Sequence, residues 1–345
     1  MHPEEPPAPA GPGPRADWEP PYPAHSSRFG SEVRDPVISY VACQSRSEDA
    51  LREATNLLEQ FLGRAEGPDF HERSAFRDEH GFVNEVFACY WLDRDRYDAW
   101  TTASGFAVWL HHPDRLASEV GVWQETILVS LDRLETIAGR PDYGIARAAA
   151  NPGETTRAHA YFGSMRHRIG AAARAPLDTP LDTPLPHRPA AAGRPTHGFL
   201  LRVRPPANMA VIRSGQDWTA VGGDELRTYL DEVHPRLLEG MAFLRDQPAA
   251  TGCLSCRFMT ERGPDGGEAS RSSGLAMFLS LRHLEEWSRG HPTHLAIFNS
   301  FWAMVRKHWD GRNLRLWHEV CVLREDNPDF VYVNCHEATG LLRWF

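Results

Sequence analysis

Long apolar runs are missing from this sequence of 345 residues. No stretch of about eighteen apolar residues occurs, so no helix is expected to cross a bilayer. The first residues are rich in Pro, Glu and Ala and lack the positively charged region and apolar run of an export signal. We therefore expect a cytoplasmic protein that does not bind a membrane.

Basic clusters and a cysteine framework are missing too. Lys and Arg never form a run longer than a pair, and the formal net charge is -9. A nucleic-acid backbone needs a basic surface, so nucleic acid is not an expected partner. The six cysteines are scattered through the chain, which is not the pattern of a disulfide-stabilised exported domain.

The two cysteines that lie closest together are Cys253 and Cys256. Their spacing is compatible with zinc or redox chemistry, but no second pair or nearby histidine completes a tetrahedral zinc site. We interpret them as two thiols on a buried strand. Arg257 stands where the attachment motif of a c-type haem has a histidine, so any haem would be bound non-covalently.

Two Pro-rich stretches divide the chain. Residues 1–30 are expected to form a flexible arm, because their composition cannot bury enough apolar area to fold. Residues 171–195, in which Leu-Asp-Thr-Pro occurs twice, are expected to form a surface loop. The remaining residues, 31–170 and 196–345, are then the two folded halves.

The two halves contain the same order of predicted elements. Apolar spacing in the first half predicts strands at residues 37–43, 75–77, 82–92 and 120–129, with helices at 48–62 and 97–110. In the second half it predicts strands at residues 209–213, 252–259, 274–281 and 314–323, with helical regions at 225–244 and 284–307. Both orders are βαββαβ.

Landmark residues agree between the halves. Trp100 corresponds to Trp287, and Trp123-Gln124-Glu125 corresponds to Trp317-His318-Glu319. We therefore predict an α+β fold of two ferredoxin-like halves, arranged like a dimeric α+β barrel, each with helices on one face of an antiparallel sheet.

Two histidines mark positions where the halves differ. His318 corresponds to Gln124, and His294 aligns near Ala107. Pro292 suits the first position of a helix and places His294 in its first turn. Helical spacing then puts His294 at the end of an apolar stripe, whose other members are Phe298, Phe301 and Val305.

Such a histidine is either a core residue or a ligand of haem iron, which a neutral histidine on an apolar helix commonly holds. His291 is the rival ligand. At the end of a predicted strand, Ser214 precedes a glycine; it is either a turn residue or a hydroxyl donor for a substrate oxygen. The glycine that a nucleophile elbow requires two residues earlier is missing, so covalent catalysis by Ser214 is disfavoured.

Three further polar residues have no clear role from their pattern. Arg166 and Arg168 alternate as extended positions would, so both side chains are expected on one side of the backbone, which is usually solvent. Glu135 is compatible with an ordinary surface position.

In these segments the sequence resembles the haem-containing aldoxime dehydratases, which include aliphatic aldoxime and phenylacetaldoxime dehydratases. The likeness covers nearly the whole chain after the arm and is densest at residues 161–168, 209–243, 284–298, 314–322 and 331–342. The resemblance implies haem b with His294, in His-Pro-Thr-His-Leu, as the proximal ligand. It makes His291 the second choice.

The same resemblance implies roles for the other polar residues. His318 corresponds to the distal catalytic histidine, and Ser214 to the hydroxyl donor. Arg168 matches the active-site arginine of Gly-Ser-Met-Arg-x-Arg, with Arg166 as the alternative. Glu135 corresponds to the glutamate that supports the distal histidine.

These implied roles give a mechanism for converting an aldoxime, R-CH=N-OH, into a nitrile. Ferrous iron would bind the oxime nitrogen, while Ser214 and Arg168 hold the hydroxyl group. His318 would donate a proton to the leaving water and then take the C-H proton, with Glu135 orienting it. The resemblance also implies a homodimer. A haem peroxidase or dismutase and a non-enzymatic haem carrier or sensor are the alternatives, and the substrate side chain stays open.

Overall fold

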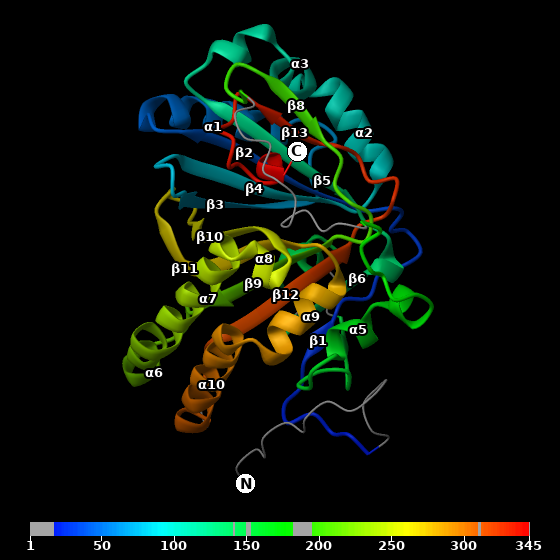
Figure 1. Cartoon of the computed structure of the whole chain (residues 1–345), viewed down its shortest axis with the longest axis vertical. Helices are drawn as coiled ribbons and strands as arrows, with labels where there is room; N and C mark the ends of the chain where they lie inside the picture. The colour runs from blue at the N-terminus through cyan, green and yellow to red at the C-terminus, as the bar shows by residue number, and fades with distance from the viewer. Residues whose placement is uncertain (1–16, 141, 150–152, 182–194, 310–311, 345) are drawn as a thin grey trace.

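In the computed structural model of the chain, the described residues include thirteen strands that form one sheet. The structure describes residues 17–140, 142–149, 153–181, 195–309 and 312–344. Two quartets of strands make up the centre of the sheet, and helices cover the outer face of each quartet (Figure 1). The predicted α+β class, with a large antiparallel sheet and flanking helices, is confirmed.

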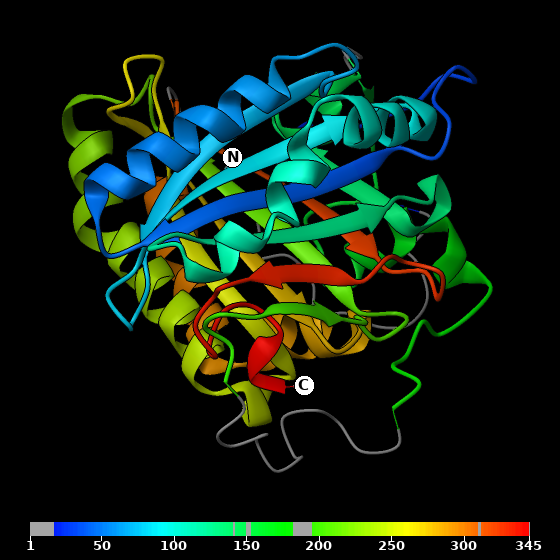
Figure 2. The same cartoon turned by 90° about the horizontal axis from the view of Figure 1, so that it is seen from above.

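The first quartet has the order β3-β4-β2-β5. Its elements are β2 (Val37–Ser45), α1 (Glu48–Leu62), β3 (Phe70–Arg77), β4 (Val83–Trp91), α2 (Arg94–Ala103), α3 (Phe106–Leu110) and β5 (Gly121–Leu128). Helix α1 begins after Ser47, whose side chain accepts a hydrogen bond from the backbone N-H of Ala50. It ends at Leu62, as predicted. Figure 2 shows α1 lying across the strands of this quartet.

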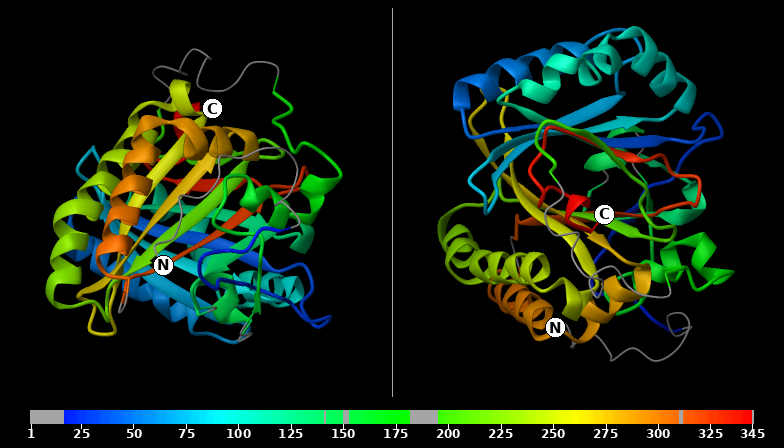
Figure 3. Two further views of the ribbon diagram at one scale, coloured as in Figure 1. Left: turned by 90° about the horizontal axis from the view of Figure 1, so that it is seen from below. Right: turned by 45° about the horizontal axis from the view of Figure 1, so that its top comes forward.

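The second quartet has the matching order β12-β9-β11-β10. Its elements are β9 (Ala210–Asp217), α6 (Gly223–Thr228), the π-helical turn η5 (Tyr229–Val233), α7 (His234–Asp246), α8 (Pro248–Thr251), β10 (Cys253–Arg262), β11 (Glu268–Phe278), α9 (Leu281–Gly290), α10 (Pro292–Lys307) and β12 (Arg315–Val322). Cys253 and Cys256 lie buried on β10, as predicted. Figure 3 shows the helices of this quartet on the side opposite α1.

The quartets meet where β10 pairs with β3, through Thr260 with Ala75 and Glu261 with Ser74. Between them lies the largest buried apolar cluster, to which both quartets contribute side chains. Successive residues of a strand face opposite sides, so the Trp-x-Glu segments of β5 and β12 point their Trp and Glu inward. Inward-pointing Glu125 accepts two hydrogen bonds from Arg257, at 2.5 and 2.7 Å, across the junction.

Short strands extend both outer edges, and the sequence did not predict them. Next to β5 lie β13 (Phe330–Val333) and β8 (Leu200–Val203); next to β12 lie β6 (Leu134–Ala138), β1 (His25–Ser26) and β7 (Glu154–Thr155). Each half of the sequence therefore contributes strands that pair with the quartet of the other half.

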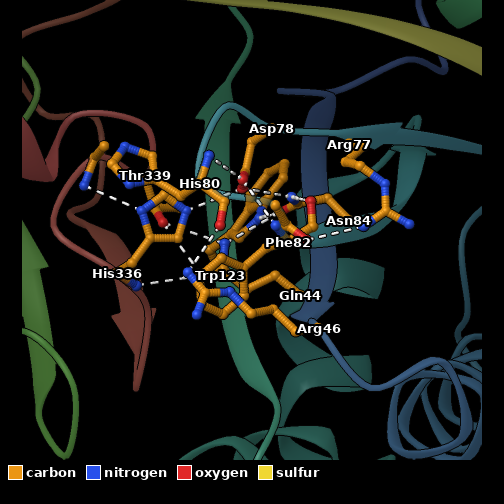
Figure 4. A network of polar contacts seen from close by, with 12 residues as sticks. Gln44, Arg46, Arg77, Asp78, His80, Phe82, Asn84, Trp123, His336 and Thr339 are labelled. Carbon is orange, nitrogen blue, oxygen red and sulfur yellow. Dashed lines mark hydrogen bonds and ion pairs between the residues drawn. The ribbon is translucent and has the colours of Figure 1, made fainter.

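A polar network fixes the segment that follows β13 to the first quartet (Figure 4). The Nε2 atom of His336 lies 3.0 Å from Oδ2 of Asp78. The side-chain amide of Gln44 donates to Oδ1 of Asn84 and to Oγ1 of Thr339, each at 3.1 Å. The C-terminal segment is thereby held against β2 and β4.

Three local predictions were wrong. Residues 164–168, expected to be extended, form the one-turn helix α5 (Ser164–Arg168). Strand β9 does not end at Ser214 but continues to Asp217, because residues 215–217 stay paired with β11 and β12. Gly215 packs under the Trp317 ring, where a Cβ atom would lie 2.2 Å from Cε2. The single helix expected at 97–110 is divided at Gly105, whose φ of +83° is in the left-handed region.

The Pro-rich predictions lie partly outside the described residues, which exclude 1–16 of the arm and 182–194 of the loop. Within the arm, His25 and Ser26 form β1. None of the helices in the described part of the chain is long and apolar enough to cross a membrane.

Candidate active site

The outer face of the second quartet brings Ser214 and His318 together. They are direct cross-strand partners in β9 and β12, so their side chains leave the sheet on the same side. On that side Val320 packs in an apolar cluster with Leu284 and Trp287 of α9. The two polar side chains thus lie on a face that is covered by helices.

Three charged or polar side chains form a compact group at one edge of this face. Nε of Arg168 donates to Oε2 of Glu135 at 2.7 Å, and Nη2 of Arg168 lies 3.2 Å from Nε2 of His318. Oε1 of Glu135 lies 2.9 Å from the same Nε2. We call Glu135, Arg168 and His318 the distal triad. Of the three, His318 has the most exposed side chain, at 25%, against 5% for Arg168 and 0% for Glu135.

Glu135 belongs to β6, where it pairs with Val320 of β12. Burial alone would raise the pKa of this carboxyl group, but the charges of Arg168 and His318 lower its pKa from 4.5 to about 2. Glu135 is therefore a buried carboxylate at neutral pH, and the surface position that its sequence pattern suggested is wrong.

The distal triad leaves one nitrogen of His318 available. Its Nε2 atom faces both the Arg168 guanidinium and the Glu135 carboxylate. A neutral Nε2 can accept from Arg168, which is always a donor, whereas a protonated Nε2 is stabilised by Glu135. Among the described residues no hydrogen bond reaches Nδ1, so a bound molecule can exchange a proton with that atom.

The Ser214 hydroxyl is equally available. The backbone carbonyl of Ser214 accepts a hydrogen bond from the Gln216 side chain at 3.4 Å, but within the described part of the chain its Oγ atom has no hydrogen-bond partner. A hydroxyl in this state can donate to an oxygen of a ligand.

Helix geometry separates the two arginines of α5. Residues two positions apart on an α-helix point about 200° apart, and these arginines accordingly find different partners. Arg166 donates to Oε2 of Glu285 on α9, from Nε at 2.9 Å and from Nη2 at 2.7 Å. Arg168 alone of the pair joins His318, so the sequence-based expectation that both point the same way is wrong.

His294 lies in the first turn of α10, which begins at Pro292 as predicted. The edge of its ring meets Trp287, with the ring centroids 4.8 Å apart. Burial lowers the pKa of His294 to about 4. The Ser288 backbone raises the pKa of His294, but the effect of burial is larger. The Nδ1 atom of His294 is buried without a hydrogen-bond partner among the described residues. His294 is therefore a neutral imidazole, which is the form that binds a metal ion.

His291 is used differently. It caps α10, with Nδ1 accepting from the backbone N-H of Thr293 at 3.3 Å and lying 2.9 Å from the Thr293 hydroxyl oxygen. Its ring packs on Phe243 at a centroid distance of 4.5 Å. These contacts occupy His291 and support His294 as the better candidate for a metal ligand.

The residues around His294 suit haem. Among the described residues no group of three or more His, Cys, Asp or Glu side chains could hold a metal ion by itself. Haem iron requires a single protein ligand and an apolar surface for the porphyrin. The two turns of α10 that follow His294 carry aromatic rings. The ring centroid of Phe298 lies 5.7 Å from that of Phe162 and 6.1 Å from that of Trp302.

His159 is a polar residue at this site that the sequence analysis did not single out. It is buried, and neither ring nitrogen has a hydrogen-bond partner among the described residues. Burial and the charge of Arg168 lower its pKa to about 4. The sequence contained little to reveal it, because the segment before Tyr161 has no regular periodicity.

A neutral histidine on an aromatic helix, together with a His-Arg-Glu group on the sheet, is an arrangement suited to a haem-dependent enzyme, because haem proteins set their chemistry by the protein groups around the iron. The comparison with known families agrees. The chain belongs to the haem-containing dehydratase family, whose model matches residues 39–341.

Relatives from several bacteria are similar over most of their length. Phenylacetaldoxime dehydratase of Bacillus sp. (strain OxB-1) is 31% identical over 323 residues, which cover 93% of this chain and 91% of the relative. Aliphatic aldoxime dehydratase of Rhodococcus globerulus is 33% identical over 333 residues, which cover 94% and 92%.

Solved structures show the same fold. A crystal structure of an aldoxime dehydratase in complex with butyraldoxime has a TM-score of 0.85 and 33% identity, and the match covers 94% of this chain and 90% of that chain. A second aldoxime dehydratase structure has a TM-score of 0.86 and 31% identity, with 95% and 93% covered.

Proposed function

We propose that this protein is a haem-dependent aldoxime dehydratase, which removes water from R-CH=N-OH and leaves the nitrile R-C≡N. The observation that carries this proposal is the distal triad, which lies beside the free Ser214 hydroxyl on the helix-covered face of the sheet. The relatives, which are named aldoxime dehydratases, support the same reaction.

His294 is the residue proposed to hold haem b. Its neutral ring and its place on an aromatic stretch of α10 suit a residue that would hold the haem iron. When bound, ferrous haem supplies a Lewis acid for the oxime nitrogen, which weakens the N-O bond.

Ser214 and Arg168 are proposed to bind the oxime hydroxyl group. Ser214 has a free Oγ-H to donate, and Arg168 carries a permanent charge that stabilises negative charge developing on the leaving oxygen. Because Glu135 and the backbone carbonyl of Ala158 hold Arg168 from two sides, the guanidinium is oriented before the substrate binds.

His318 is proposed to move both protons. In its charged form, Nε2-H faces the Glu135 carboxylate and Nδ1-H is open to the substrate. Nδ1 donates its proton to the departing hydroxyl group, so that water leaves. The same atom then accepts the proton from the aldoxime carbon, and the imidazolium is restored.

We further propose that the chain consists of two ferredoxin-like halves and forms a homodimer in the cytoplasm. Two observations support two ferredoxin-like halves, residues 31–170 and 196–345. The quartets share one strand order. An arginine also covers each of the matching rings, with its Cζ atom 4.1 Å from the Trp123 centroid and 5.0 Å from the Trp317 centroid. A homodimer and a cytoplasmic location belong to this proposal as well. The molar mass of the purified protein in solution tests the dimer.

One experiment tests the function. The absorption spectrum of the purified protein is recorded before and after reduction with dithionite, and butyraldoxime is then added while nitrile formation is followed. We expect a Soret band that shifts when the aldoxime meets the ferrous form, together with butyronitrile as product. Oxidation of a dye by peroxide without any nitrile would contradict the proposal and favour a haem peroxidase.

A further inference from the structure

The N-terminal residues 18–27 lie against both supports of Arg168. Strand β1 pairs with β6, through His25 and Ala138 (Figure 1). The backbone N-H of Ser27 donates to Oγ1 of Thr136 at 2.8 Å. Thr136 directly follows Glu135, the carboxylate that binds Arg168. We call residues 18–27 the N-terminal clasp.

On its other side, the clasp holds the loop that contains Ala158. The backbone N-H of Thr156 donates to the carbonyl of Ala24 at 3.0 Å. Nε1 of Trp18 donates to the His159 carbonyl at 3.2 Å, and the Tyr22 ring lies 5.1 Å from the His159 ring. The clasp thus contacts the loop on both sides of Ala158.

The Ala158 carbonyl accepts a hydrogen bond of 2.6 Å from Nη1 of Arg168. The loop around it has a backbone conformation that costs free energy. Ala160 has φ +60°, a left-handed conformation that costs free energy for a residue with a Cβ atom. His159 is buried beside Tyr22 of the clasp. Contacts from outside must therefore hold the loop in place.

We propose that the N-terminal clasp is part of the catalytic apparatus and that Trp18 and Tyr22 are positioning residues, which act on the reaction by fixing the Arg168 guanidinium through the loop of residues 154–161. The clasp lies before residue 39, where the match to the family model begins. The proposal rests on the proposed role of Arg168.

Variants of Trp18 in the full-length, haem-loaded protein test this proposal. Trp18→Ala removes the donor to the His159 carbonyl and the edge contact with Tyr161, whose ring centroid lies 5.7 Å away. We expect kcat for butyraldoxime to fall about tenfold with little change in KM, because misplacing a catalytic group lowers the rate more than binding. Trp18→Phe, which keeps an aromatic ring but loses the N-H donor, should give an intermediate loss even if Trp18→Ala unfolds.

Trp109 provides the matched control. It is a half-buried tryptophan on α3 that packs on Phe61 at 5.7 Å, in the first half of the molecule. Trp109→Ala should leave kcat unchanged. If Trp18→Phe and the control have the same kcat as the wild type, the clasp proposal is wrong.

A double-mutant cycle with Arg168→Ala separates positioning from general stability. If Trp18 acts through Arg168, Trp18→Phe should lower kcat in the wild type but cause no further loss in Arg168→Ala. Equal losses in both backgrounds would overturn the proposal. If the wild type forms no nitrile, the proposed function fails. If Arg168→Ala turns over normally, the proposed role of Arg168 fails and the clasp proposal with it; if Arg168→Ala loses activity while Trp18→Phe does not, the clasp alone fails.

Discussion

The outer faces of the two quartets have the same strand order but different packing. In the first half, Gln124 pairs with Val41, and its side chain donates to Tyr97 and Ser39 at 3.2 and 3.4 Å. In the second half, His318 at the corresponding position pairs with Ser214. The side-chain amide of Gln124 is therefore hydrogen-bonded within the first half. Nδ1 of His318, by contrast, has no hydrogen-bond partner among the described residues.

The covering helices differ in the same way. Trp100, Phe106 and Leu110 of α2 and α3 are at most 1% exposed, so they close the first face. Helix α10 has sixteen residues, of which Trp302, Met304 and Val305 are buried, and the residues around His294 stay partly exposed. We infer that the second face keeps reactive groups available, whereas the first face buries its own under α2 and α3.

The largest expected effect is the loss of the cofactor from the second face. His294→Ala should purify as a folded protein largely free of haem, because it removes the proposed ligand of the haem iron and leaves the aromatic surroundings intact. The ratio of Soret to protein absorbance measures this. His291→Ala is the control and should retain haem; the reverse result would assign the ligand to His291.

The second-largest effect is expected from Ser214→Ala, which should lower kcat. Removing one positioned donor from an active site commonly lowers kcat by about two to three orders of magnitude. Haem content and circular dichroism should stay at wild-type values, since the Ser214 hydroxyl has no hydrogen-bond partner among the described residues. Unchanged nitrile formation would return Ser214 to a purely structural role in β9.

Glu135→Gln should change the pH dependence of stability. The folded pKa of Glu135 is lowered from 4.5 to about 2, so its carboxylate stabilises the protein above pH 4.5 and loses this effect as the pH falls towards 2. Urea unfolding of the haem-free proteins should show the wild type more stable at pH 7, by on the order of 3 kcal/mol. This difference should shrink between pH 4.5 and 2; a constant difference would contradict the ion pair.

The smallest effect on turnover is expected in the first half. Gln124→Ala removes a side chain that corresponds to His318 but contacts Tyr97 and Ser39 instead. Its kcat should equal that of the wild type, while the free energy of unfolding falls by about 1 kcal/mol because hydrogen bonds are lost. A large loss of turnover would show that the two faces are not functionally distinct.

Periodic segments of the sequence predicted the central fold well. The apolar spacing around Leu51 and Leu58 placed α1, and the apolar spacing over residues 120–129 and 314–323 placed β5 and β12. Strands such as β1 and β7 have two residues each, too few to show a period, and they form through pairing with distant segments. Local sequence cannot reveal such pairing.

The candidate site was predictable where a residue's surroundings are local. His294 follows a proline that begins its helix, so its place on α10 was predicted correctly. Glu135 and Arg168 bind each other although they lie 33 residues apart in the sequence. Their burial depends on the sheet that brings the two segments together. Whether Arg166 or Arg168 meets His318 depends on the one-turn helix α5, which has no periodic signal.

The single-turnover behaviour of His318→Asn tests the central claim most directly. Asparagine keeps polarity and similar size but cannot titrate. We predict that the ferrous variant keeps haem and shows the same Soret shift with butyraldoxime as the wild type, but forms nitrile about two to four orders of magnitude more slowly. A variant that binds the aldoxime and forms nitrile at the wild-type rate would contradict proton transfer by His318 and, with it, the assignment of chemistry to the second face.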